Sequence, residues 1–327
     1  MGSDSSLCFF SVIIPLYNKA DTIVRTLKSV SWQKFRDFEV VVVDDGSKDD
    51  GVAVVEAFNG IERIRLIRQE NAGVSAARNR GVAEARGRYM AFLDADDEWH
   101  PDYLQELSLA IRKIPDAVVY GANYANVVGD LYATGQYVMN KRIRRIDLFS
   151  VWSKRCPIHT SSAVIEREAF MKAGGFNPAS HYFEDAELLF KLALLGGFVV
   201  SKRVLVKYHT DAIVRATGGA VDYGRYAHWW YLERSLRENN PNLSLVCVAR
   251  MEMHRRFVYN YLLDAFGDSK RLKELFYKMA ETTSWRVGLL MRKNPIGTTW
   301  ALLHKLWWGL GNRIQFVHGQ VKNLEWV

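Results

Sequence analysis

The sequence predicts an α/β fold in which a mostly parallel, Rossmann-like sheet is flanked by helices and followed by a helical C-terminal extension. Two observations carry this prediction. Continuous apolar runs of strand length alternate with segments of helical spacing, an order typical of parallel strands joined by right-handed crossovers. Two of these runs end in acidic residues, which places carboxylates at the edge where open α/β sheets bind ligands.

Four apolar runs predict the first strands of the sheet, and helical segments separate them. The runs are residues 8–14, 38–43, 64–67 and 89–93. Asn18 is placed to cap the first helix, and Ser47 or Asp49 to cap the second. The third helix follows the turn at 71–73 and carries small residues, among them Gly81, on one face. That face predicts close packing of the third helix on the sheet.

The same analysis predicts further elements after Trp99. They are a helix at 102–112, strands at 117–124 and 161–165, a helix at 167–173, an amphipathic helix within 181–195 and a strand at 199–206. The chain of 327 residues, 49% of them apolar, is long enough for one large domain with an appendage.

Three carboxylates follow the fourth predicted strand within four residues: Asp94, Asp96 and Asp97. Carboxylates this close repel one another unless a cation joins them. Mg²⁺ and Mn²⁺ take oxygen ligands, commonly one or two carboxylates together with substrate phosphates. We therefore infer a metal and diphosphate site. The alternative is a solvated acidic turn that also caps a helix starting near Trp99.

Missing motifs narrow the class of phosphate site. No G-x-G-x-x-G follows the first strand, and no G-x-x-x-x-G-K-[ST] occurs in the chain. The glycines of a dinucleotide enzyme and the lysine of a P-loop enzyme are therefore absent, and carboxylates with a metal ion would have to hold the phosphates.

The ends of the chain and its cysteines carry compartment information. Residues 1–7 are polar and lack a signal-peptide pattern, so we expect a disordered N-terminus or a remnant of cloning, and a cytoplasmic protein. Cys8, Cys156 and Cys247 lie far apart without a CxxC pair. They predict neither a zinc site nor a disulfide framework.

Four segments together resemble one enzyme family. They are residues 11–18 (SVIIPLYN), 44–47 (DDGS), 71–79 (NAGVSAARN) and 92–97 (FLDADD). Their order and spacing resemble those of the inverting glycosyltransferases of family 2, of the bacterial surface-polysaccharide type, which have a GT-A fold. The resemblance covers roughly residues 8–210 and implies a catalytic domain at 8–222.

The resemblance also implies donor-site roles for residues at three strand ends. These are Pro15 and Tyr17 bordering the base of a nucleotide-sugar donor, Asp44 and Asp45 in hydrogen bonds to that base, Asp94 at the ribose, and Asp96 on a Mn²⁺ or Mg²⁺ ion at the diphosphate. Arg78 is a candidate donor-site cation, and the alternative is an arginine on a solvated helix face.

A second acidic pair, Glu184 and Asp185, begins the amphipathic helix within 181–195. Acids in a first turn also stabilise the helix dipole. The resemblance implies instead that Asp185 is the catalytic base and Glu184 a supporting carboxylate. It further makes His209 a candidate metal ligand, although residues 210–213 (TDAI) depart from the family pattern. A core or surface histidine is the alternative.

The last third of the chain is basic and aromatic. Residues 201–327 hold 20 Lys and Arg against 10 Asp and Glu. The pattern of residues 223–327 predicts a helical region. Within it, residues 285–317 are rich in Trp, Leu and basic residues, which favours a segment that lies in the interface of an anionic membrane. Without a nucleic-acid motif beside the charge, a nucleic-acid partner is not expected.

The sequence thus predicts a metal-dependent hexosyl- or N-acetylhexosaminyl-transferase. A UDP-sugar is the expected donor, with a dTDP- or GDP-sugar as the runner-up, and the acceptor is a glycan or lipid-linked glycan at the inner face of the cytoplasmic membrane. The alternative from another class is a non-catalytic nucleotide-sugar or glycan binding module of the same fold.

Overall fold

The structure is a computed structural model, and it describes residues 8–128, 131–134, 141–148, 158–179 and 184–209. The expectations for the start at 1–7, the domain boundary at 222, the helical extension at 223–327 and the membrane segment at 285–317 lie outside these residues. Cys8 is buried, and its thiol donates a hydrogen bond to the Phe10 carbonyl oxygen at 3.2 Å.

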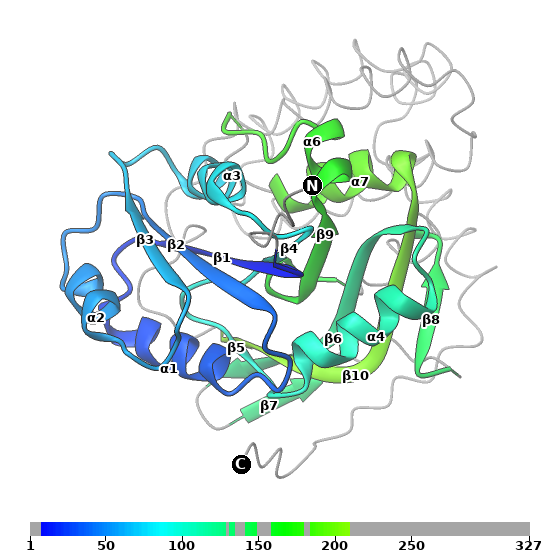
Figure 1. The fold of residues 1–327 in the computed structure, drawn as a ribbon, viewed down its shortest axis with the longest axis horizontal. Coiled ribbons are helices and arrows are strands. Elements are labelled where there is room, and N and C mark those ends of the chain that lie inside the picture. The colour runs from blue at the N-terminus through cyan, green and yellow to red at the C-terminus, as the bar shows by residue number, and fades with distance from the viewer. Residues whose placement is uncertain (1–7, 129–130, 135–140, 149–157, 180–183, 210–327) are drawn as a thin grey trace, which may run out of the picture. The chain divides into compact units, whose positions relative to one another are not determined.

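The described strands form one mixed sheet (Figure 1). They are β1 (Phe10–Leu16), β2 (Phe38–Asp44), β3 (Ile64–Arg68), β4 (Tyr89–Phe92), β5 (Glu98–Trp99), β6 (Ala117–Val128), β7 (Leu131–Thr134), β8 (Ile143–Ile146), β9 (Ala163–Glu166) and β10 (Gly197–His209). The main order is β3-β2-β1-β4-β9-β6-β10-β5, with β7 beside β6 and β8 beside β10.

The first half of the sheet is the predicted parallel unit. β1 pairs in parallel with β2 and β4, and β2 pairs in parallel with β3. In the second half, β9 is antiparallel to both β4 and β6, whereas β6 and β10 are parallel. The predicted fold class is therefore confirmed as a mostly parallel, mixed sheet.

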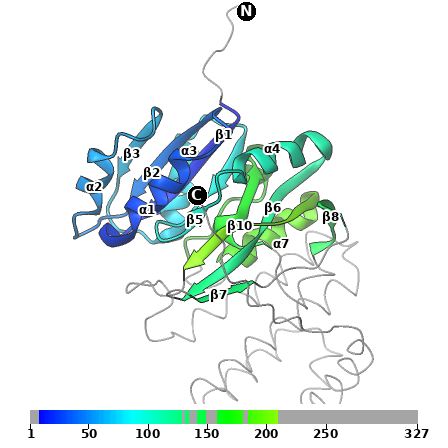
Figure 2. The same ribbon diagram turned by 90° about the horizontal axis from the view of Figure 1, so that it is seen from below.

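Helices cover the sheet. They are α1 (Ala20–Ser31), α2 (Gly51–Ala57), α3 (Val74–Glu84), α4 (Tyr103–Lys113), α6 (Arg167–Lys172), α7 (Glu184–Leu195) and the 3-10 turn η1 (Thr160–Ser162). Figure 1 shows α1 and α2 on one side of the first strands and α3 on the other. A view from below shows the first strands with α1, α2 and α3 in blue and cyan, beside the green half that holds β6 and β10 (Figure 2).

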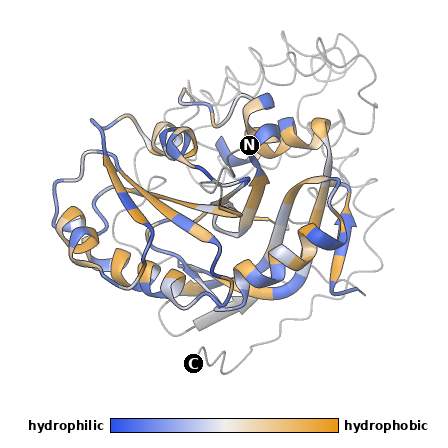
Figure 3. Cartoon of the chain, in the orientation of Figure 1, coloured by the Kyte–Doolittle hydropathy of each residue, from blue (hydrophilic) through white to orange (hydrophobic). Residues whose placement is uncertain are grey.

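Apolar strands and one small residue explain the close packing of the parallel half. All residues of β2 are buried, and Figure 3 shows the central strands largely in the hydrophobic colour. Helix α3 lies so near β1 that a Cβ atom at Gly81 would be 2.4 Å from Ile13 Cγ2. The predicted small-residue face is therefore where the helix contacts the sheet.

The structure corrects the expected cap at Asn18. Asn18 has a positive φ of 51°, and its side-chain oxygen accepts a hydrogen bond from the Lys48 amide at 2.8 Å. Asp49 instead accepts from the Ala20 amide at the start of α1 at 2.8 Å, and from Gly51 at the start of α2 at 3.0 Å. One carboxylate thus contacts two helix N-termini. The expected cap of the second helix needs a correction, because the N-cap residue of α2 is Asp50 and its side chain makes no cap hydrogen bond.

The helix predicted at 102–112 is α4 (Tyr103–Lys113), and it does not start near Trp99 as the acidic-turn alternative assumed. Trp99 belongs to β5, which pairs antiparallel with β10 at Val206, and α4 begins at Tyr103. The alternative of an acidic turn that caps a following helix therefore does not describe residues 94–97.

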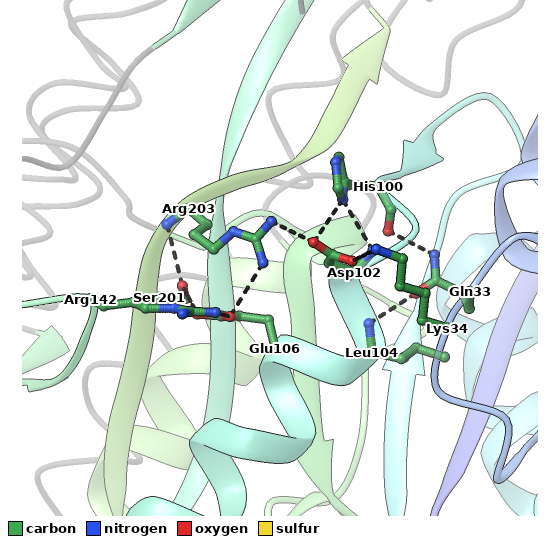
Figure 4. Close-up of polar contacts among 9 residues, drawn as sticks. All are labelled: Gln33, Lys34, His100, Asp102, Leu104, Glu106, Arg142, Ser201 and Arg203. Carbon is green, nitrogen blue, oxygen red and sulfur yellow. Dashed lines mark hydrogen bonds and ion pairs between the residues drawn. The ribbon is translucent and has the colours of Figure 1, made fainter. Parts of the chain in front are cut away.

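A polar cluster joins α4 to β8 and β10 (Figure 4). The side chain of Glu106 on α4 is 1% exposed and accepts hydrogen bonds from Arg142, just before β8, and from Ser201 on β10. Arg203 on β10 contacts Asp102 at 2.6 Å. Hydrogen bonds from Lys34 and Arg203 lower the pKa of Asp102 to about 2. The cluster fixes β10 in place, and β10 carries His209 at its end.

Candidate active site

Arg78 on α3 joins the two acidic centres that the sequence predicts. Its Nη2 donates to Asp94 Oδ1 at 2.7 Å, and its Nη1 donates to Glu184 Oε1 at 3.0 Å. The residue is 3% exposed, and its guanidinium lies 5.1 Å from the centroid of the Phe176 ring. The alternative of a solvated surface arginine is therefore wrong. Arg78 brings the end of β4 and the start of α7 to one place at the sheet edge.

Burial and charge shift the carboxyl pKa values at this place in opposite directions. Burial acts to raise the pKa of Asp94, but the Arg78 charge and other nearby cations outweigh it and lower that pKa. Burial raises the pKa of Glu184, with Arg78 opposing and Asp185 adding to the shift. Burial likewise raises the pKa of Asp185. Two neighbouring centres thus hold an acid that ionises readily and a pair that retain their protons to higher pH.

Asp185 is held by the backbone at the start of α7. Its Oδ1 accepts a hydrogen bond from the Ala186 amide at 2.7 Å. Burial and the nearby charge of Asp94 raise its pKa, while the Ala186 amide and the Arg78 charge act against that rise. A carboxylate that the backbone holds in this way can accept a proton from a bound hydroxyl group.

Helix α1 holds the acidic turn at 94–97. Three of its side chains donate to successive backbone carbonyls of that turn: Thr22 to Ala95 at 2.9 Å, Arg25 to Asp96 at 2.8 Å and Thr26 to Asp97 at 2.8 Å. At the start of the helix, Lys19 Nζ lies 2.6 Å from Asp96 Oδ2. The position of the predicted metal ligand is therefore fixed by α1, and sequence reasoning did not foresee the Lys19 pair.

Asp97 has a structural place in the same turn. It is fully buried, its Oδ1 accepts from the His209 amide at 3.0 Å, and its Oδ2 accepts from the Ser161 hydroxyl. Burial, together with the charges of Asp94 and Asp96, raises its pKa well above the ordinary value. Asp97 thus ties the end of β10 and the turn η1 to the end of β4.

The residues predicted to bind the nucleobase of the donor lie at the ends of β1 and β2, which are neighbours in the sheet. Pro15 pairs with Val43 in the register, and Tyr17, just beyond β1, is 39% exposed. Asp45 is 3% exposed and accepts three hydrogen bonds at 2.8 Å, from the Gln69 side chain and from the amides of Ala72 and Gly73.

Asp44 is buried as well, and its Oδ1 accepts from the Ser47 amide at 3.0 Å. Both aspartates therefore hold the neighbouring loops in place through hydrogen bonds to backbone amides. The direct contact of Asp44 and Asp45 with a base stays a prediction.

His209, the other predicted metal ligand, pairs with Glu98. Its Nε2 lies 2.7 Å from Glu98 Oε1. No group of three or more His, Cys, Asp or Glu side chains in the described part of the chain is arranged to hold a metal ion. The oxygens of Asp94 and Asp96 are nevertheless the hard ligands that Mg²⁺ or Mn²⁺ takes, and such ions take their remaining ligands from substrate phosphates and water. The donor set fits that mode, with Asp96 as the protein ligand.

His159 is a site residue that sequence reasoning missed. Its Nδ1 accepts from the Ser161 amide at 3.3 Å, and its ring lies 4.0 Å from that of Tyr208. Burial lowers its pKa, against the opposing charge of Asp94. In the neutral ring, Nδ1 is the acceptor and Nε2 carries the hydrogen. The signal available in the sequence was the run of small polar residues after His159, which predicts a turn but no chemistry.

Asn79 on α3 positions the turn at 174–176 that follows α6. Its side-chain amide donates to the Phe176 carbonyl at 2.7 Å, and its oxygen accepts from the Phe176 amide at 2.9 Å. A Cβ atom at Gly175, where φ is +68°, would be 2.7 Å from that oxygen. Two successive residues of α3 therefore organise the site. Arg78 contacts Asp94 and Glu184, and Asn79 holds the turn at 174–176.

Comparisons with known proteins define the class. The model of glycosyl transferase family 2 matches residues 11–174, the part of the chain that holds β1 to β4, β9 and the acidic turn. A solved structure of S. aureus TarS 1-349 in complex with UDP-GlcNAc is similar to this chain with a TM-score of 0.74. The similarity covers 90% of this chain and 87% of that one at 20% identity. This similarity gives the fold, which is GT-A. The chain belongs to glycosyl transferase family 2.

Curated glycosyltransferases are also similar to this chain. An amylovoran biosynthesis glycosyltransferase, AmsB of Erwinia amylovora, is 42% identical over 108 residues, 32% of this chain and 36% of that protein. A glycosyltransferase of Rickettsia felis is 27% identical over 208 residues, 62% of this chain and 34% of that protein. The chain therefore matches about a third of the length of these relatives. Among the described residues no helix is long and apolar enough to span a bilayer.

Proposed function

We propose that this chain is an inverting glycosyltransferase that moves a hexosyl or N-acetylhexosaminyl group from a UDP-sugar to a hydroxyl of a glycan or lipid-linked glycan. One observation carries the proposal: the buried Arg78 side chain contacts both Asp94, after β4, and Glu184, at the start of α7. This arrangement supports a donor site and a base within reach of one another. The names of relatives such as AmsB support polysaccharide synthesis as the setting.

The donor would lie along the carboxyl ends of β1, β2 and β4. Pro15, Tyr17, Asp44 and Asp45 line the base end, and Asp94 faces the ribose. Asp96, with His209 as a second candidate, would hold a Mn²⁺ or Mg²⁺ ion. Such an ion, when bound, offsets the negative charge that develops on the leaving diphosphate.

Asp185 is the proposed general base. The acceptor oxygen bonds to the anomeric carbon while the bond from that carbon to the diphosphate oxygen breaks on the opposite face, and Asp185 takes the hydroxyl proton. The buried position that raises its pKa strengthens it as a base, provided that the carboxyl group is ionised. Glu184, paired with Arg78, keeps the start of α7 oriented.

A base variant tests the chemical step. Asp185→Asn should bind UDP as the wild type does and lose transfer by about a hundredfold or more, since positioned proton transfer contributes roughly 10²–10⁴-fold. The assay is UDP release from UDP-sugars in the presence of bacterial glycan and lipid-linked glycan fractions. Glu168→Gln, on α6 with a side chain 81% exposed, is the matched control and should be unaffected. Normal turnover by Asp185→Asn would rule Asp185 out.

A binding panel tests the donor class. Calorimetric titration of UDP, GDP, dTDP and CDP, with and without Mn²⁺, is expected to give metal-dependent binding of UDP that Asp96→Ala loses. Preference for GDP or dTDP would move the proposal to the runner-up donors. Tight binding without any transfer by the wild type would favour a non-catalytic nucleotide-sugar or glycan binding module, because binding alone needs no base.

A further inference from the structure

Both acids of the segment 94–96 are already paired with a cation of the chain itself. Arg78 contacts Asp94, and Lys19 contacts Asp96 at 2.6 Å, with side chains 15% and 16% exposed for Lys19 and Asp96. The two cations differ in how they are held. Arg78 is enclosed between two carboxylates and an aromatic ring, whereas Lys19 stands on a flexible four-carbon stem at the start of α1.

The backbone that carries Lys19 is fixed at the preceding residue. Asn18 adopts a positive φ of 51°, and it is held by hydrogen bonds to the neighbouring loop: its amide donates to Ser47 Oγ at 3.1 Å, and its side-chain oxygen accepts from the Lys48 amide at 2.8 Å. Thr22 on α1 also donates to the Ala95 carbonyl at 2.9 Å, so the start of α1 is joined directly to the turn that carries Asp96.

A divalent ion on Asp96 competes with this lysine for the same carboxylate. The ammonium group of Lys19 repels a divalent cation nearby. Asp96 Oδ2 is also occupied by the ion pair as long as Lys19 remains in contact with it. The diphosphate of a nucleotide changes this balance, because its oxygens offer the ammonium group another anionic partner.

We propose that Lys19 makes metal binding depend on the nucleotide diphosphate. Without nucleotide, Lys19 neutralises Asp96 and keeps its affinity for a free divalent ion low. When the diphosphate arrives, the ammonium group transfers from Asp96 to a phosphate oxygen, and Asp96 becomes available to the metal ion. Lys19 is thus a positioning residue for donor and metal together. This inference rests on the proposed function, since it places the diphosphate beside Asp96.

The test compares wild type, Lys19→Gln and Lys19→Arg. Free Mn²⁺ is measured by electron paramagnetic resonance during titration of each protein without nucleotide. UDP binding is then measured calorimetrically in EDTA and again with saturating Mn²⁺. Lys34→Gln is the matched control: Lys34 makes an ion pair of similar length, 2.7 Å, with Asp102 in the α4 cluster and takes no part in the site. Thermal unfolding of every variant confirms that the fold is retained.

Lys19→Gln should bind Mn²⁺ alone about tenfold more tightly than the wild type and metal-free UDP about tenfold more weakly, the change that follows loss of an interaction of about 1.4 kcal/mol. Lys19→Arg and Lys34→Gln should resemble the wild type in both titrations. Asp96→Asn should abolish Mn²⁺ binding in the Lys19→Gln background, which locates the ion at this carboxylate.

The two ideas fail in different ways. Equal Mn²⁺ and UDP affinities for wild type and Lys19→Gln, with normal binding of UDP and Mn²⁺ together, overturn the role of Lys19 and leave the proposed function standing. If the wild type binds none of the nucleotides with Mn²⁺, the donor site is wrong and the inference falls with it.

Discussion

Replacing Arg78 by Met should remove the link between the two acidic centres. The substitution keeps a stem of similar length on α3 and deletes two charge-assisted hydrogen bonds, one to Asp94 at 2.7 Å and one to Glu184 at 3.0 Å. Removing one partner of a buried ion pair costs about 3–5 kcal/mol. The two carboxylates are 23% and 17% exposed, so water recovers part of that loss. We expect the free energy of unfolding to fall by about 3 kcal/mol at pH 7.

The loss should depend on pH in a defined direction. Arg78 contributes to holding the pKa of Asp94 below its ordinary value. A carboxyl group with a lowered pKa adds stability that is present above its unfolded pKa and is lost as the pH falls through the folded pKa. The difference between wild type and Arg78→Met should therefore shrink below about pH 4.

Urea unfolding followed by far-UV circular dichroism measures both effects. Arg80→Met is the matched control on the same helix, because the Arg80 side chain is 54% exposed and pairs with Glu84 across one helical turn. That surface pair is worth about 0.3–0.5 kcal/mol. If Arg78→Met costs no more than Arg80→Met, or costs as much in acid as at neutral pH, the bridge does not have the energetic role argued from its geometry.

Four further predictions concern other residues of the site and its support. Burial raises the pKa of Asp185 above its ordinary value of 3.8, so the ionised carboxylate destabilises the fold. Asp185→Asn should therefore stabilise the fold at pH values above that raised pKa and give no gain in acid. Thermal melts across pH measure the difference, and a gain that persists in acid would contradict the prediction. The acid limb of the wild-type transfer rate should also fall at a pH above 3.8, as a pH profile of kcat/KM will show. A Gly→Ala change within a helix usually adds about 1 kcal/mol to the free energy of unfolding. At Gly81 the new Cβ atom would be 2.4 Å from Ile13 Cγ2, so we expect Gly81→Ala to lower the free energy of unfolding by about 1–3 kcal/mol. Urea unfolding measures this change, and a gain in stability would refute the close contact. His159→Phe preserves the ring contact with Tyr208 and removes the Nε2 hydrogen, so transfer should fall about tenfold or more while UDP affinity changes little, and unchanged transfer would exclude His159 from the site.

The sequence predicts the parallel half of the fold well because its signals are local. Each of β1, β2, β3 and β4 is a short apolar run between helical segments, and the structure places each strand within two residues of its expected bounds. Trp99 shows the limit. Its strand β5 exists through pairing with β10, more than a hundred residues away, and no local pattern records that pairing.

The candidate site follows the same division. A strand-end motif predicted Asp94 and Asp96, and the start of an amphipathic helix, together with the family resemblance, predicted Glu184 and Asp185. The structure joins the two groups through Arg78, which contacts Asp94 and Glu184. Lys19 and His159 could not be found in this way, because a single lysine or histidine has no spacing signature, and their roles depend on which side chains the fold places opposite them.

The contact between Arg78 and Glu184 can form only late in the synthesis of the chain. The two residues are 106 positions apart in the chain. At a synthesis rate of roughly 5–20 residues per second, about 5–20 seconds separate their emergence from the ribosome. During that interval the guanidinium group has Asp94 as a partner and lacks Glu184. A nascent chain can therefore form the Arg78–Asp94 pair first, and the contact with Glu184 forms only after the start of helix α7 has been translated.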